Sequence, residues 1–299
     1  MLYQAHLSST RRSCPVSLIH ALLLGLLQGA TEFLPVSSSG HLVLVPWLLG
    51  WPAPGLAFDA LVHWGTAVAV VGYFWRDWTV LLRGCWQALR TRSLADPHAR
   101  LGWLILLGTV PATLAGWLLE DFFAEMFARP IAAAGFLLVT AGFLTLAEGW
   151  ATRRGGPQSP LSKDRTTTEG CPSLSSLDAI LIGLAQAVAI MPGVSRSGAT
   201  IAAGMGRGME REPAARFSFL LATPIVLGAG LLQALDLVRA GTLTARFPAL
   251  AVGFLAALVS GLACIHFLLR YLQRRPLYPF ALYCALFGIV GIILSLLAV

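Results

Sequence analysis

Long apolar stretches alternate along the chain with short polar segments that are rich in arginine. A helix crosses a bilayer with about 20 apolar residues. Stretches that reach or approach this length are 57–75, 101–118, 131–149, 217–235, 248–271 and 278–298. Two other apolar regions, 17–51 and 177–206, are interrupted by prolines and by clusters of serine and glycine. The pattern predicts an all-α polytopic membrane protein with six transmembrane helices and two interrupted regions.

Each interrupted region is predicted to form a re-entrant helix-loop-helix hairpin, because irregular backbone is tolerated at membrane depth only where protein or a water-filled cavity surrounds it. The two regions contain related segments, 25–41 and 183–199, which match at seven of seventeen positions with one offset (183 − 25 = 158). The identical pairs are Gly25/Gly183, Leu26/Leu184, Gln28/Gln186, Val36/Val194, Ser37/Ser195, Ser39/Ser197 and Gly40/Gly198. The match indicates an internal duplication.

The duplication divides the chain into a first membrane repeat (1–150, motif 25–41), a linker (151–176) and a second repeat (177–299, motif 183–200). The linker is rich in glycine, proline, serine and threonine and is predicted to be a flexible loop. Interrupted apolar segments at matching places in two halves are typical of a binding site at the interface of membrane repeats. The functional site is therefore expected between the two motifs.

The orientation of the repeats follows from the basic residues of the short loops, which mark the cytoplasmic side. Segments 76–100 and 152–176 are arginine-rich or basic, whereas 119–130 is acidic. If 17–51 returns to its own side, the second repeat is inverted relative to the first. Arg11 and Arg12 fit an outer N-terminus poorly. The alternative is that 17–51 crosses once and the repeats are not strictly inverted.

Composition supports a membrane protein, since 57% of the residues are hydrophobic and 12% are charged, against about 25% charged in soluble domains. The net charge of +7 lies mainly in the loops, so we expect no nucleic-acid partner. The five cysteines are scattered without metal-ligand spacing. The bilayer is the expected environment.

A carboxylate stands out in the first motif, because charge inside a membrane segment marks function by default. Glu32 follows Gln28 by four residues, which places both side chains on one helix face. Glu32 is a candidate base, metal ligand or partner of a buried cation; the alternative is a carboxylate at the water interface.

Polar residues continue after Pro35 with Ser37, Ser38, Ser39 and His41. Serines before an apolar helix cap it, and the free N–H groups of such a helix start bind anions. His41 titrates near neutral pH and is a candidate for proton transfer or for attack on phosphorus.

The second motif repeats this helix-start chemistry and adds a guanidinium. Arg196 is flanked by Ser195 and Ser197, and Thr200 follows. A guanidinium forks onto two phosphate oxygens, so the two motifs together predict equipment for phosphoryl transfer. Asp59 and His63, four residues apart, either shape the pocket or form an interfacial pair.

The motifs QGATEFLPVSSSGH (28–41) and PGVSRSGAT (192–200), with Phe217 and the SFLL sequence after it, resemble the undecaprenyl pyrophosphate phosphatases, also called bacitracin-resistance proteins. The resemblance covers nearly the whole chain. It implies a multi-pass enzyme of the bacterial inner membrane that removes the terminal phosphate of a C55 prenyl pyrophosphate and regenerates the lipid carrier of peptidoglycan synthesis. It also implies a divalent cation, Mg²⁺ or Ca²⁺, and allows a homodimer.

Matched residue by residue, the resemblance makes Glu32, Ser38, His41 and Arg196 catalytic and assigns substrate binding to Ser37, Ser39, Ser195, Ser197 and Thr200. Glu32 and Gln28 are the expected cation ligands, although Gln28 stands where many members have a glutamate. Ser38, His41 or water could be the nucleophile. A prenyl-phosphate flippase or secondary transporter is the competing interpretation, because such proteins also use inverted repeats. A structural membrane scaffold would leave the charged set unexplained.

Overall fold

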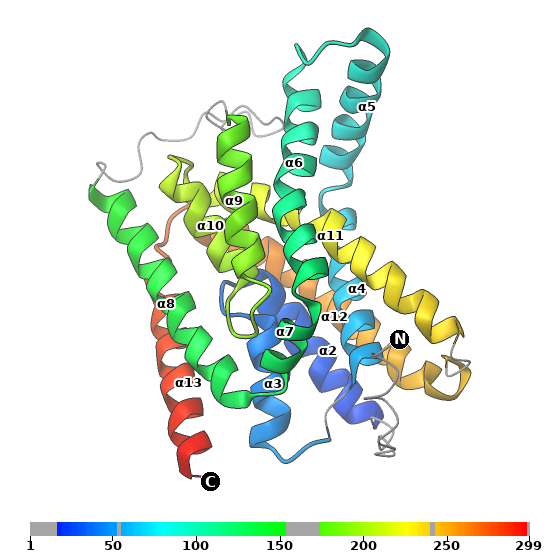
Figure 1. Ribbon diagram of the computed structural model, residues 1–299, viewed down its shortest axis with the longest axis vertical. Helices are drawn as coiled ribbons and strands as arrows, with labels where there is room; N and C mark the ends of the chain where they lie inside the picture. Colours follow the sequence, from blue (N-terminus) through cyan, green and yellow to red (C-terminus); the bar gives the residue numbers. More distant parts are fainter. Residues whose placement is uncertain (1–16, 53–54, 154–173, 240–242, 298–299) are drawn as a thin grey trace.

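A computed structural model of the protein describes residues 17–52, 55–153, 174–239 and 243–297, which form helices and no strands (Figure 1). In chain order the helices are α2 (Leu18–Phe33), α3 (Ser38–Leu48), α4 (Leu56–Tyr73), α5 (Trp75–Thr91), α6 (Pro97–Leu118), α7 (Glu120–Phe127), α8 (Pro130–Arg153), α9 (Ser176–Val188), α10 (Arg196–Gly206), α11 (Arg211–Arg239), α12 (Leu243–Leu272) and α13 (Tyr278–Leu297). The all-helical prediction is confirmed for the described residues.

Five described helices are long and apolar enough to cross a membrane: Pro97–Leu118, Pro130–Arg153, Arg211–Leu232, Phe247–Leu272 and Tyr278–Leu297. They coincide with five of the six predicted spans. The sixth, 57–75, corresponds to α4, which is not among the five. The predicted linker 151–176 falls largely on 154–173, outside the described residues, as do Arg11 and Arg12.

Each interrupted region forms two short helices joined by a tight loop. α2 ends where Leu34 turns extended before Pro35, as residues that precede proline do. Ser37 adopts φ of 70° and its hydroxyl caps α3 by accepting the N–H of Gly40 at 3.2 Å. In the second region Ser195 caps α10 in the same way, accepting the N–H of Gly198 at 3.0 Å.

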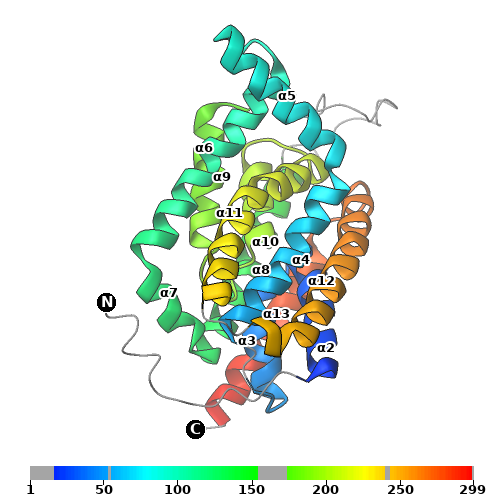
Figure 2. The same cartoon turned by 90° about the vertical axis from the view of Figure 1, so that its right-hand side faces the viewer.

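The two halves pack on each other reciprocally. α2 of the first half lies against α12 of the second, and α9 of the second lies against α6 of the first. α4 likewise contacts α12, and α11 contacts α6, while α4 also meets α11 and α8 meets α13. Each hairpin therefore rests on a long helix that belongs to the other half (Figures 1 and 2).

Equivalent glycines make these crossings close. A Cβ on Gly25 would collide with the carbonyl oxygen of Gly253 on α12, and a Cβ on Gly183 would collide with the carbonyl oxygen of Gly108 on α6. Gly25 and Gly183 differ by the repeat offset of 158 (183 − 25). Small residues at helix interfaces let backbones approach closely inside membranes. These two matching positions of the motifs therefore make the same kind of close helix crossing.

Candidate active site

The last turn of α2 carries a buried amide and a buried carboxylate. The side-chain nitrogen of Gln28 donates to Glu32 Oε2 at 2.9 Å, and Gln28 and Glu32 are 0% and 7% exposed. Their spacing of four residues had predicted a shared helix face, which the structure confirms. A buried carboxylate needs partners, because an unpaired charge in a low-dielectric interior is costly.

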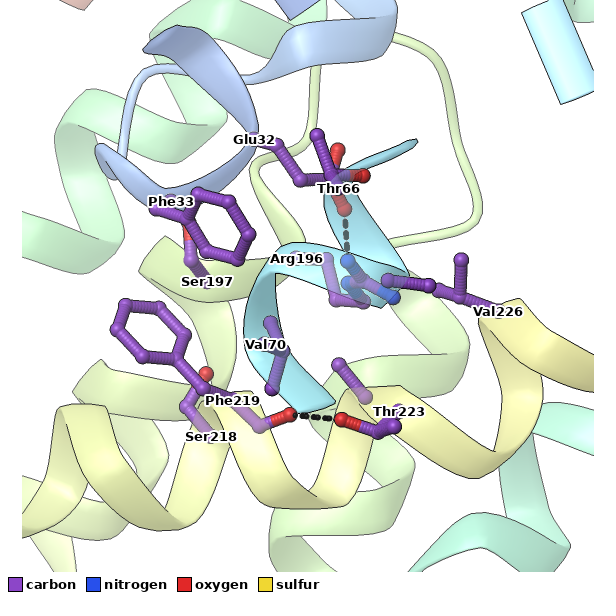
Figure 3. Close-up of a pocket in the computed structure, with 12 residues that line it drawn as sticks. Glu32, Phe33, Thr66, Val70, Arg196, Ser197, Ser218, Phe219, Thr223 and Val226 are labelled. Carbon is purple, nitrogen blue, oxygen red and sulfur yellow. Dashed lines mark hydrogen bonds and ion pairs between the residues drawn. The ribbon is translucent and has the colours of Figure 1, made fainter. Parts of the chain in front are cut away.

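Those partners come from the first residues of two other helices. Ser38, which begins α3, donates its hydroxyl to Glu32 Oε2 at 2.5 Å. Arg196, which begins α10, forms an ion pair with Glu32 Oε1 (Figure 3). Ser38 and Arg196 are equivalent in the duplication (196 − 38 = 158). Matching positions of the two motifs therefore supply a hydroxyl and a guanidinium to one carboxylate.

Direct contacts between the loops hold the two hairpins together. The hydroxyl of Ser39 accepts the N–H of Gly193 at 3.4 Å, and the hydroxyl of Ser197 donates to the carbonyl oxygen of Leu34 at 3.3 Å. A Cβ on Gly40 would lie 3.1 Å from the Cα of Gly193. These contacts fix the distance between the two helix starts.

Helix α8 supports the second loop through Thr140. The Thr140 hydroxyl donates to the carbonyl oxygen of Gly193 at 2.9 Å and accepts the N–H of Ser195 at 2.8 Å. Because this side chain bonds the loop on both sides of Val194, it positions the start of α10. The sequence offered no signal for this role, since Thr140 stands alone in an apolar helix.

Several hydroxyls that were predicted to bind substrate form hydrogen bonds with other groups of the protein. Ser37 and Ser195 cap their helices, and Thr200 bonds the carbonyl oxygen of Arg196 at 2.7 Å and the hydroxyl of Ser218 at 2.5 Å. Ser197 lines the cavity described below. The structure thus places Ser197 toward the site, whereas Ser37, Ser195 and Thr200 shape the helix starts.

His41 lies on α3 but its ring is directed to other partners than Glu32. Nδ1 lies 2.7 Å from the carbonyl oxygen of Ser37, and Nε2 lies 2.7 Å from the hydroxyl of Tyr283 on α13. Since a carbonyl only accepts, Nδ1 carries the proton and Nε2 accepts from Tyr283. The ring also stacks on Phe287. No sequence pattern had linked His41 to α13.

A second histidine approaches Glu32 from α4. His63 Nε2 lies 3.8 Å from Glu32 Oε2, and its Nδ1 donates to the carbonyl oxygen of Asp59 at 2.6 Å. Because Nδ1 is bonded to the Asp59 carbonyl oxygen, Nε2 is the ring nitrogen that faces the carboxylate. The structure places His63 beside the Glu32 carboxylate, but neither Asp59 nor His63 is among the residues that line the cavity described below.

A cavity opens beside the ion pair, and most of its lining residues, polar and apolar together, come from α4 and α11 (Figure 3). Its polar lining comprises Glu32, Arg196, Ser197, Thr66, Ser218 and Thr223. Its apolar lining includes Val70 of α4 together with Phe219 and Val226 of α11. The lining thus combines the charged groups of Glu32 and Arg196 with hydroxyl and apolar side chains.

One oxygen at the site fits a hard cation. Gln28 Oε1 is buried without a hydrogen-bond partner, although it belongs to the same amide that donates to Glu32. Mg²⁺ and Ca²⁺ prefer oxygen ligands such as amide and carboxylate groups. The described residues contain no cluster of three His, Cys, Asp or Glu side chains able to hold a metal. Gln28 and Glu32 fit a cation only together with oxygens from another source.

Comparison with known proteins identifies the family of this chain. Residues 21–290 match the family described as Bacitracin resistance protein BacA. The chain belongs to this family. Its BacA relatives include proteins named undecaprenyl-diphosphatase from Thermomicrobium roseum, which is 43% identical over 278 residues (90% of this chain, 95% of the relative), and from Pelotomaculum thermopropionicum, 41% identical over 280 residues (94% and 97%). A third, from Nitrosococcus oceani, is 45% identical over 273 residues (90% and 96%).

Proposed function

We propose that this chain is an undecaprenyl-diphosphate phosphatase that hydrolyses undecaprenyl pyrophosphate to undecaprenyl phosphate and phosphate, and so recycles the lipid carrier of peptidoglycan synthesis. BacA membership and the names of the relatives support this substrate and reaction. The observation that carries the proposal is the convergence of Ser38 and Arg196 on the buried carboxylate of Glu32. A hydroxyl and a guanidinium at two helix starts, both in contact with a carboxylate base, are suited to phosphoryl transfer.

Substrate binding would exchange one anion for another at Arg196. The guanidinium turns from Glu32 to the terminal phosphate, where its planar fork meets two phosphate oxygens. The N–H groups at the starts of α3 and α10 add a favourable field for the same charge. The prenyl chain would leave the site between α4 and α11, past Val70 and Val226.

The chemistry would run in two displacements. Ser38 Oγ attacks the terminal phosphorus and its proton moves to Glu32 Oε2, which already accepts the Ser38 hydroxyl. The new Oγ–P bond replaces the bond to the bridging oxygen, so undecaprenyl phosphate leaves with the electron pair. Water then attacks the phosphoserine, a proton passes to the serine oxygen through Glu32, and phosphate is released.

Two alternatives for the nucleophile remain within the proposal. Direct attack by water would use Glu32 as general base and leave Ser38 as a positioning group. Attack by His41 would require Nε2 to release the Tyr283 hydroxyl that it accepts in this structure. We favour Ser38 because its hydroxyl is already bonded to the base.

A divalent cation would be held by Gln28 Oε1, by a Glu32 oxygen freed when Arg196 turns away, and by the pyrophosphate. Bound there, it would neutralise developing charge on the phosphate oxygens. Gln28 supports this assignment because its amide oxygen has no partner within the protein.

We further propose that α4 completes a set of six spans and that the α2–α3 and α9–α10 hairpins are re-entrant, in two repeats of opposite orientation in the bacterial inner membrane. The reciprocal packing of each hairpin on the other half supports this arrangement. The proposal allows a homodimer in the same membrane.

Phosphate release from C55 pyrophosphate by the purified protein in detergent tests the function. We expect release that requires the cation and that Glu32→Gln abolishes. No release from well-folded protein, judged by a cooperative thermal transition, would contradict the enzyme and favour transport of a prenyl phosphate.

A further inference from the structure

Helix α5 differs from the spanning helices in carrying two distinct exposed stripes. Together with the first turns of α6 it forms a hairpin that extends beyond the other helices (Figures 1 and 2). Only a narrow face of α5 is buried, at Leu81, Gly84 and Ala88. This face packs on α6, where Gly84 lies close to Ala99. The rest of α5 is left facing outward.

The first stripe is apolar. Trp75, Leu82, Trp86 and Leu89 are 56%, 64%, 57% and 59% exposed. Their spacings of seven, four and three residues place them on one side of the helix. Exposed apolar surface of this extent on one helix marks a contact with a membrane or a partner. We call these residues the apolar stripe.

The second stripe is basic and lies directly beside the first. Arg76, Arg83 and Arg90 recur every seven residues and are all exposed. The guanidinium of Arg76 lies 5.3 Å from the ring centre of Trp75, and that of Arg90 lies 4.9 Å from that of Trp86. These contacts join the arginine stripe to the apolar stripe along the helix.

The charge of the arginine stripe is not balanced by nearby acids. Within 75–100 the acidic residues are Asp77 and Asp96. Asp77 pairs with Arg216 of α11 at 3.0 Å, and Asp96 caps α6 and contacts His98. No carboxylate in the described part of the chain forms an ion pair with Arg76, Arg83 or Arg90. The stripe therefore presents uncompensated positive charge.

We propose that α5 binds anionic phospholipid headgroups, with its apolar stripe in the membrane interface and its arginine stripe on the lipid phosphates. A helix with tryptophan and leucine on one side and arginine beside them is the amphipathic pattern that lies in a bilayer interface. Basic segments next to membrane helices attract anionic lipids. Charge complementarity thus selects an anionic lipid surface over a neutral one. The site is separate from the phosphatase site and does not depend on its chemistry.

The test uses the purified full-length protein, stripped of lipid and mixed with equal amounts of phosphatidylglycerol and phosphatidylcholine, with the bound lipids counted by native mass spectrometry. We expect a preference for phosphatidylglycerol in the wild type. Combining Arg76→Gln, Arg83→Gln and Arg90→Gln should weaken the preference by about fivefold per arginine. Phosphatase activity in detergent should be unchanged, which shows that the variant is folded.

A matched control removes the same charge elsewhere. Arg270, Arg274 and Arg275 are exposed at the end of α12 and after it. Their combined change to glutamine should leave the lipid preference near the wild-type value. Equal lipid retention by the wild type and the α5 variant would overturn the proposal. Efficient cross-linking of two copies through Trp86→Cys in phosphatidylglycerol vesicles would also overturn it, because the stripe would then be a dimer surface.

Discussion

Arg196 on α10 is paired with Glu32 on α2 across 164 positions of sequence. The glutamate is almost fully buried and the arginine is partly exposed. Burying such a pair gives little net stability, but removing one partner leaves a charge without compensation. The pair is therefore better explained by the proposed function than by stability. In that function the Glu32 carboxylate occupies the position on Arg196 that the substrate phosphate takes when it binds.

Arg196→Lys keeps the charge and removes the planar fork. We expect phosphate release to fall by about 10²-fold, because a lysine cannot bond two phosphate oxygens in parallel. The measurement is kcat/KM with C55 pyrophosphate. Arg207→Lys is the control: Arg207 is the C-cap residue of α10 and pairs with Asp178, and neither residue lines the cavity. Similar losses in both variants would contradict a specific role for Arg196.

Ser38→Ala removes the proposed nucleophile. Turnover should drop by roughly 10³-fold, and a phosphoenzyme trapped by rapid quench in the wild type should disappear. Ser39→Ala, which loses the bonds to Gly193 N–H and to the hydroxyl of Ser37, should retain the phosphoenzyme. Phosphate found on His41 would identify His41 as the nucleophile. The absence of any covalent species during turnover would favour direct attack by water.

His63→Ala removes the side chain whose Nε2 faces Glu32 Oε2 at 3.8 Å. We expect kcat to fall about 10- to 100-fold, within the range of groups that assist proton transfer, with little change in thermal stability. His266→Ala serves as control because its contact with Tyr73 lies at an exposed place. An unchanged kcat in His63→Ala would show that His63 does not assist the reaction and only packs beside Glu32.

Gln28→Glu should make the site more dependent on a cation. A second carboxylate beside Glu32 would be repelled by the Glu32 carboxylate unless a divalent ion lies between the two. Mg²⁺ or Ca²⁺ should therefore raise the melting temperature of the variant more than that of the wild type.

EDTA should stop phosphate release by the wild type, and added cation should restore it. Equal thermal shifts in the two proteins would argue against Gln28 as a ligand.

Glu148→Gln should destabilise the protein without acting on the reaction. Glu148 is 1% exposed and pairs with Arg211 of α11 (Nε to Oε1 3.0 Å), and it accepts the N–H of Leu277 before α13 at 3.0 Å. Breaking a buried pair costs about 3–5 kcal/mol. Glu125→Gln, in an exposed pair with Arg129, should cost about 1 kcal/mol or less. Equal melting temperatures would contradict this role.

The local features of the site could be predicted from the sequence. Helix spacing placed Gln28 beside Glu32, and the serines of both motifs marked helix starts, because these relationships depend on residues a few positions apart. The repeat offset also indicated that the two motifs meet. These inferences needed no knowledge of the wider fold.

The partners that come from distant helices could not be predicted. Tyr283 reaches His41 across 242 positions, and Thr140 reaches Ser195 across 55. Neither residue differs in pattern from the apolar sequence around it, because a single hydroxyl does not disturb a spanning helix. The sequence spacing relates His63 to Asp59, but the approach of His63 to Glu32 depends on how α4 packs against α2.

The paired glycine crossings, Gly25 on Gly253 and Gly183 on Gly108, mean that each half of the chain needs the other to bury one side of its hairpin. The two halves are intertwined in the manner of a domain-swapped dimer whose subunits have been fused. A half expressed alone would expose the side of its hairpin that packs on the other half, whereas two halves produced together as separate polypeptides have the surfaces needed to assemble. The fold is in this sense completed only when both halves of the chain are present.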